Sequence, residues 1–114
     1  MTSGRQLVFV DKKMIHPEGS LPLVLEYYIC QDVVRGRGLV YGLRVDKRCL
    51  DGVLLEREET PPFTTSREEA TALASMFAAG TVPPCVLLEM VDERYGLYLD
   101  NPAGIHTARE EYIA

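Results

Sequence analysis

Apolar and polar residues change their spacing along the chain near residue 64. Before that point, apolar residues alternate with polar residues in several runs separated by glycine, proline and aspartate. After it, apolar residues recur at the three- and four-residue intervals of a helix. This order predicts an α+β fold: an antiparallel meander of about four strands, followed by two helices packed on one face of the sheet in a two-layer arrangement.

Four segments are predicted to be strands, and two of them have the alternation that is typical of a half-buried strand. In the second and third of them the odd-numbered residues are apolar, so we expect these residues to face the helices and the even-numbered residues to form an outer face. The predicted strands are residues 6–10 with an extension to 15, residues 23–31, residues 39–46 and residues 53–59.

Turn residues predict how the middle strands pair. A hairpin centred near Arg35 places Glu26 opposite Arg44, which predicts an exposed ion pair on the outer face. This pairing explains why each of the two strands has a charge in its middle without assigning Glu26 a catalytic role.

The third and fourth strands can pair in two ways. A tight turn at Asp51-Gly52 places Val45 opposite Glu58, whereas a longer loop over residues 46–52 pairs Val45 with Val53. The longer loop keeps the apolar face continuous, and we therefore expect it.

The first helix is predicted over residues 66–80. Ser66 and Glu69 have the spacing of a capping box, and Gly80 suits the left-handed position after the last turn. Pro84 suits the first position of a second helix, in which we expect Asp92 to point outward. The buried stripe of the first helix is Ala70, Leu73, Ala74 and Phe77.

Length and composition are those of a soluble globular protein. The 114 residues predict a single domain over residues 1–114, with the tail from residue 96 to 114 left open as either flexible or folded over the sheet. No apolar run approaches the roughly 18–20 residues that span a bilayer, and no signal peptide is evident. The three cysteines form no metal or disulfide pattern, which favours a reducing cytoplasmic setting.

The charge is unevenly distributed along the chain. Residues 1–57 have nine basic and seven acidic groups, whereas residues 58–114 have three basic and ten acidic groups. The net charge of −5 argues against nucleic acid as the main partner. The acidic groups are expected to solvate the helices, although the asymmetry also allows contact with another chain.

The middle of the chain has three short motifs and an acidic residue near the end of the second helix: Tyr41-Gly42-Leu43-Arg44-Val45, Ser66-Arg67-Glu68-Glu69, Val82-x-Pro84-x-x-Leu87 and Asp92. With these residues the chain resembles a family of small, uncharacterised bacterial domains. The resemblance covers about residues 23–95 and departs from the family pattern at Pro83, where that pattern has Ser or Thr as a helix cap. The family has no assigned activity, so the resemblance implies no catalytic residue.

No catalytic, cofactor-binding or metal-binding residue is predicted, and the pattern leans away from an enzyme. His16 and His106 lie beside turn signals and have no other ligand at a suitable spacing. Cys49 follows Lys47 and Arg48, and these positive charges make it the one thiol whose reactivity merits a test. A structural role is still favoured, because no base or oxyanion donor can be named beside it.

Four basic residues predict a possible nucleic-acid surface. Arg35 and Arg37 lie at a hairpin tip, and Lys47 and Arg48 lie at the other end of the third strand. This basic patch supports an alternative function, weak binding of nucleic acid, but the acidic balance of the whole chain opposes it. A second alternative is a small-molecule-binding domain with a cleft between sheet and helices.

Apolar residues on the outer face predict a contact with protein. Val24, Tyr28 and Val40, together with Cys30, fall on the side opposite the predicted core. They form either an interaction patch or a surface that the ends of the chain cover. The leading hypothesis is therefore a non-catalytic interaction module that contacts itself or another protein, as a homodimer or a subunit of a complex, without a membrane anchor or a cofactor.

Overall fold

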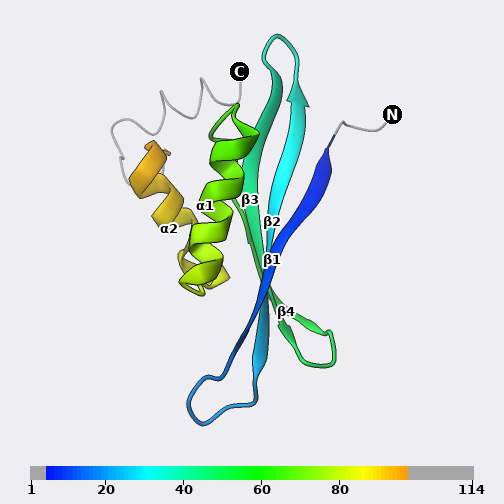
Figure 1. Ribbon diagram of the computed structural model, residues 1–114, viewed down its shortest axis with the longest axis vertical. Coiled ribbons are helices and arrows are strands. Elements are labelled where there is room, and N and C mark those ends of the chain that lie inside the picture. Colours follow the sequence, from blue (N-terminus) through cyan, green and yellow to red (C-terminus); the bar gives the residue numbers. More distant parts are fainter. Residues whose placement is uncertain (1–4, 98–114) are drawn as a thin grey trace.

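The computed structural model describes residues 5–97 and has two layers, a sheet and a pair of helices. The four antiparallel strands lie in the order β1-β2-β3-β4, and both helices lie on the same side of the sheet (Figure 1). This confirms the α+β meander. The elements are β1 (Gln6–Ile15), β2 (Leu23–Val34), β3 (Gly38–Cys49), β4 (Leu54–Glu59), α1 (Arg67–Ala79) and α2 (Pro84–Tyr95).

The core lies between the sheet and the two helices. The odd-numbered residues of β2 and β3 meet the apolar stripes of the helices, as their alternation predicts. The Tyr27 hydroxyl also donates a buried hydrogen bond to the Val82 carbonyl oxygen at 2.8 Å, which ties the sheet to the connection between the helices. The core includes Leu25, Tyr27, Ile29, Leu43, Val45, Leu73, Phe77, Leu87 and Val91.

The hairpin between β2 and β3 is centred one residue later than predicted. Val34 pairs with Gly38, and the Arg37 amide donates to the Val34 carbonyl, so the turn is centred on Gly36, whose φ of 84° suits glycine. Glu26 consequently lies opposite Asp46 and not opposite Arg44. The prediction of that pair is wrong because the turn, rather than the charges, sets the register.

The hairpin between β3 and β4 has a tight turn over residues 49–52 and the register that pairs Val45 with Glu58, not the one that the longer loop predicts. The Gly52 amide donates to the Cys49 carbonyl at 3.0 Å, and Val45 lies opposite Glu58. A bulge between Lys47 and Arg48 in the ladder shifts the register. The predicted longer loop is wrong because ionic pairing on the outer face, described below, outweighs a continuous apolar face at this edge.

The chain after β4 stays against β3. The Thr60 amide donates to the Leu43 carbonyl, and the Thr60 hydroxyl accepts from the Leu43 amide. This segment leaves no room for a side chain at residue 42, since a Cβ atom there would lie 2.9 Å from the Thr60 carbonyl oxygen. Gly42 is therefore required for close approach of the two backbones.

Helix α1 is capped at its start as predicted, but it ends differently. The Ser66 hydroxyl accepts from the Glu69 amide at 3.1 Å, while the Glu69 carboxylate accepts from the Thr64 hydroxyl instead of returning to Ser66. Gly80 has a φ of −92°, and the left-handed residue is Thr81 with a φ of 48°. The left-handed position comes one residue later because the helix continues to Ala79 and uses Gly80 as its last cap.

Helix α2 begins at Pro84 as predicted, and its N-cap, Pro83, makes no side-chain capping bond. Asp92 is 5% exposed, so the expectation that it points outward is wrong. The helix ends at Gly96, which is left-handed and whose amide donates to the Asp92 carbonyl. No helix within residues 5–97 has the length and apolar character needed to cross a membrane.

Candidate interaction surface on the outer sheet face

The face of the sheet opposite the helices, here called the outer face, is built from side chains that share rows across the four strands. The strand pairings align Phe9 with Tyr28, Arg44 and Glu59 in one row. The next rows along the strands are Lys12, Glu26, Asp46 and Arg57, then Met14, Val24, Arg48 and Leu54. Leu7, Cys30 and Gly42 form a further row on the other side of the Phe9 row, followed by Asp32 and Val40.

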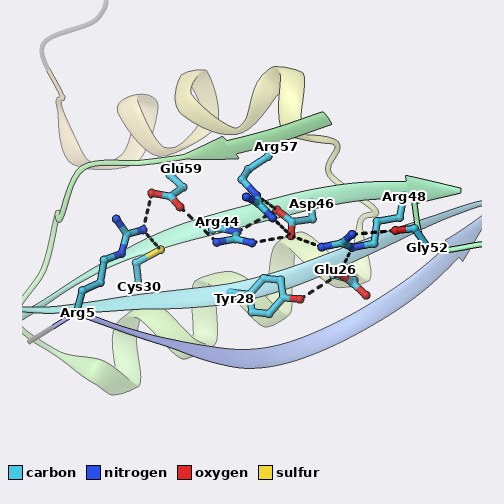
Figure 2. A network of polar contacts seen from close by, with 10 residues as sticks. All are labelled: Arg5, Glu26, Tyr28, Cys30, Arg44, Asp46, Arg48, Gly52, Arg57 and Glu59. Atoms are coloured by element: carbon cyan, nitrogen blue, oxygen red, sulfur yellow. Dashed lines mark hydrogen bonds and ion pairs between the residues drawn. The ribbon is translucent and has the colours of Figure 1, made fainter. Parts of the chain in front are cut away.

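Asp46 is the centre of an ionic cluster on this face (Figure 2). Its two carboxylate oxygens accept bidentate hydrogen bonds from Arg44, both at 3.0 Å, and from Arg57 at 2.9 and 3.2 Å. Arg48 adds a longer contact at 3.4 Å. Although the outer face is open, the Asp46 side chain is 0% exposed because the three guanidinium groups cover it.

Two glutamates extend the cluster in opposite directions. The Glu26 carboxylate accepts from Arg48 Nε at 2.9 Å. At the other end, Glu59 pairs with Arg44 at 3.6 Å. It also pairs with Arg5, the residue just before β1. Each carboxylate of the cluster therefore has at least one arginine partner, and Figure 2 shows the cluster as one continuous network.

The guanidinium groups keep Asp46 ionised in the folded protein. Burial by itself raises the pKa of a carboxyl group, but the hydrogen bonds from Arg44 and Arg57 outweigh burial, and the pKa of Asp46 is lowered. A buried carboxylate with several charge-assisted hydrogen bonds holds its donors in fixed positions. The centre of the outer face is therefore a preorganised ionic platform.

Tyr28 joins the ionic cluster to the aromatic part of the face. Its ring lies 5.2 Å from the Arg44 guanidinium carbon, and its hydroxyl donates to Glu26 at 3.0 Å. On the other side, the Phe9 ring meets it edge-on with centroids 5.7 Å apart. Burial, followed by the bond to Glu26, raises the pKa of Tyr28, so the phenol is a neutral donor.

The β1 margin of the outer face exposes apolar side chains. Leu7, Phe9 and Met14 are 40%, 54% and 55% exposed, although all three lie in rows with well-packed residues of β2. The alternation of the sequence does not identify these residues, because β1 has apolar residues on both faces. A bulge between Phe9 and Asp11 changes the alternation in the middle of the strand, so a regular period assigns its faces wrongly.

The structure brings together only part of the predicted interaction patch. Val24 and Tyr28 are half-buried and share the outer face of β2, but Glu26 lies between them. Val40 is only 4% exposed, so its place in an exposed patch is wrong. Its strand neighbour Tyr41 forms a bridge with Thr64, and the segment after β4 follows β3 at this point.

The predicted basic patch is divided between the two ends of β3. Arg35 and Arg37 are exposed in the β2–β3 turn, whereas Lys47 and Arg48 lie about 30 Å away at roughly 3.3 Å per residue. Lys47 pairs with Glu56 at 3.0 Å, and Arg48 belongs to the cluster around Asp46. The four residues do not form one surface, because they lie at opposite ends of β3. Two of them, Lys47 and Arg48, are also already paired with carboxylates.

The other chemical candidates are separated in space. His16 is exposed in the β1–β2 loop, and His106 lies outside the described residues, as does most of the tail from residue 96 to 114. Cys49 is a half-buried free thiol at the end of β3. Within residues 5–97 no group of three His, Cys, Asp or Glu residues is placed to hold a metal ion.

A motif in β3 could have revealed the cluster from sequence. Arg44, Asp46 and Arg48 alternate along one strand, so all three must share a face. The third guanidinium comes from Arg57, which reaches Asp46 only through the tight β3–β4 turn. The sequence of β3 therefore predicts that its two arginines and Asp46 share a face. The contact with Arg57 follows only from the β3–β4 register that places Arg57 opposite Asp46.

Comparison with known proteins places the chain in a family without assigning it a function. The model of a family of unknown function, DUF6514, matches residues 6–96, which extends the resemblance seen in the sequence to include β1. No curated protein and no solved structure matches the chain. The match covers the whole sheet and both helices, and the chain therefore belongs to the DUF6514 family.

Proposed function

We propose that this protein is a non-catalytic interaction module, acting as a homodimer or as a subunit of a complex, and that its outer sheet face contacts another protein chain. The observation that carries the proposal is the exposed apolar margin of β1, formed by Leu7, Phe9 and Met14, beside the ionic platform. An exposed phenylalanine contributes little to folding, but it is among the side chains enriched at protein interfaces.

The rigid centre of the outer face supports this function. A surface whose side chains are already held by ion pairs loses little conformational entropy when a partner binds. Arg44 is 12% exposed and is held in place by Asp46, Glu59 and the Tyr28 ring. Its guanidinium group therefore has a fixed position in the same row as Phe9. Aromatic and arginine side chains together are the usual composition of binding hot spots.

We also propose a reducing, cytoplasmic location. Cys30, Cys49 and Cys85 are all free thiols, and no pair of them forms a disulfide. Burial raises the pKa of Cys30, with a further contribution from Glu59, which keeps that thiol protonated against the opposing effect of Arg5. Free thiols of this kind are typical of compartments in which disulfides do not persist.

Light scattering of the purified protein over a range of concentrations tests the self-association form of this proposal. If the protein is a homodimer through the outer face, Phe9→Glu yields the monomer mass, because it introduces a charge into the contact. Val33→Glu is the matched control, since Val33 is 58% exposed and lies on the opposite side of the sheet near the β2–β3 turn. A dimer that survives Phe9→Glu would contradict the assignment of this face.

A further inference from the structure

The exposed charges in the row of Lys12 on the outer face are positive. The two carboxylates of this row are the less exposed groups: the side chains of Asp46 and Glu26 are 0% and 19% exposed. The Arg57 side chain is 38% exposed, and Lys12 is also exposed. This row is therefore cationic at its surface, although its ion pairs neutralise most of its charge.

Lys12 is the most available of these cations. It shares a row with Glu26, but the Glu26 carboxylate is already bonded to Arg48 and to the Tyr28 hydroxyl. Within the part of the chain that the structure describes, the Lys12 ammonium group forms no ion pair. An unpaired lysine between apolar neighbours is a ready partner for a carboxylate from another molecule.

The neighbours of Lys12 define the shape of what would bind. Phe9, Lys12 and Met14 follow one another on the outer face of β1, because the bulge at Val10 brings Phe9 and Lys12 to the same side. Successive side chains on one face of a strand lie about 7 Å apart. An extended protein segment with the pattern apolar-x-acidic-x-apolar presents its side chains at the same spacing.

We infer that the outer face binds an acidic protein segment, in which a carboxylate contacts Lys12 and the flanking apolar side chains contact Phe9 and Met14. This inference rests on the proposed function and names the chemistry of the partner. A second copy that meets this face at the Lys12 row is disfavoured as the partner, because the exposed charges of that row are positive in both chains.

Titration followed by NMR chemical shifts tests the inference with three probes. The first is a soluble ten-residue peptide with a central Leu-Ser-Glu-Ser-Leu, the second has Lys in place of its Glu, and the third is a ten-nucleotide single-stranded RNA. We expect the Glu peptide to shift the amide signals of Phe9, Lys12 and Met14, and to bind more weakly as salt is raised. The Lys peptide should bind at least about tenfold more weakly.

Charge reversal on the two faces of β1 supplies the matched control. Lys12→Glu should weaken binding of the Glu peptide about tenfold and improve binding of the Lys peptide. Lys13→Glu makes the same change one residue later, but Lys13 lies opposite Leu25 on the inner side and beside Asp11, so it should leave both affinities nearly unchanged. Unaltered amide spectra outside β1 would show that both variants fold.

Different failures have different meanings. Equal binding of the Glu and Lys peptides at Phe9 would overturn the acidic specificity and leave the interaction surface in place. Equal effects of Lys12→Glu and Lys13→Glu would also overturn it, as would tight binding of the RNA in the absence of peptide binding. A monomeric protein whose outer-face signals respond to none of the three probes would overturn the proposed function as well.

Discussion

The two faces of this sheet use the same strands but are stabilised in different ways. In the middle of β2 and β3 the inner face consists of apolar residues that are at most 5% exposed, and two helices close over it. The outer face has no helix over it, yet its central carboxylate is as fully buried as Leu25. One face excludes water with a second layer of structure, whereas the other excludes it with its own arginines.

The two faces therefore contribute differently to the stability of the fold and to the specificity of its strand pairing. Apolar burial on the inner face is non-directional and scales with area. The ionic cluster on the outer face needs defined angles and distances, since a buried ion pair offsets its desolvation cost only with good geometry. The inner face therefore accounts for most of the folding free energy, and the outer face fixes the register of the β3–β4 hairpin and the shape of the surface.

The largest effect is expected from opening the inner core. Phe77 is 1% exposed, so Phe77→Ala should lower the free energy of unfolding by about 3–5 kcal/mol. Chemical denaturation measures this as a lower midpoint with an unchanged slope. Met76→Ala on the same helix is the control, because Met76 is 43% exposed and its removal should cost less than about 1 kcal/mol. Equal losses for the two variants would mean that α1 does not close the core as described.

The inner face was also the part that could be predicted from the sequence. Alternation of odd-numbered residues in β2 and β3 depends on local spacing, and so does the stripe of α1 that ends at Phe77. The capping hydrogen bond from Glu69 to Ser66 is similarly local. Each of these predictions needed only residues within one element, and each is confirmed.

The outer face could not be predicted because its contacts cross between elements. Asp46 appears in the sequence as a charged residue in a strand, which normally indicates exposure. Its burial requires Arg57, and Arg57 is opposite only in the tight-turn register. Apolar continuity favours the other register, in which Arg57 is not opposite Asp46, so the sequence does not predict the centre of the candidate site.

The next largest effect is expected at that centre. Asp46→Asn keeps the shape of the side chain but removes the charge shared by Arg44 and Arg57, and it should lower the free energy of unfolding by about 2–3 kcal/mol. Thermal or chemical unfolding at pH 7 measures the loss. Asp32→Asn is the control on the same face, since Asp32 has no ion pair among the described residues and should change stability by less than about 0.5 kcal/mol. A loss no larger than the control would show that the cluster contributes no net stability.

The lowered pKa of Asp46 also predicts that the free energy of unfolding depends on pH. The pKa of Asp46 is lower in the folded protein than in the unfolded chain, so its stabilising contribution is complete above the unfolded value of about 3.9 and is lost as the pH falls through the folded pKa. The difference in unfolding free energy between the wild type and Asp46→Asn should therefore narrow from pH 7 to pH 2. A difference that stays constant over this range would mean that Asp46 does not titrate with a lowered pKa.

The smallest effect is expected where the outer face is most apolar. Phe9→Ser removes a ring that is 54% exposed and whose main contact is the edge-on approach to Tyr28. An aromatic pair contributes only about 0.5–1.5 kcal/mol, so the free energy of unfolding should fall by about 1 kcal/mol or less. Chemical denaturation measures this loss. Tyr27→Phe, measured in the same way, removes the buried hydrogen bond to Val82 and gives the comparison for the inner face. If Phe9→Ser proves as costly as a core substitution, Phe9 stabilises the fold, and its exposure no longer supports a contact surface. A small loss would leave binding as the better physical reason for an exposed phenylalanine at this position.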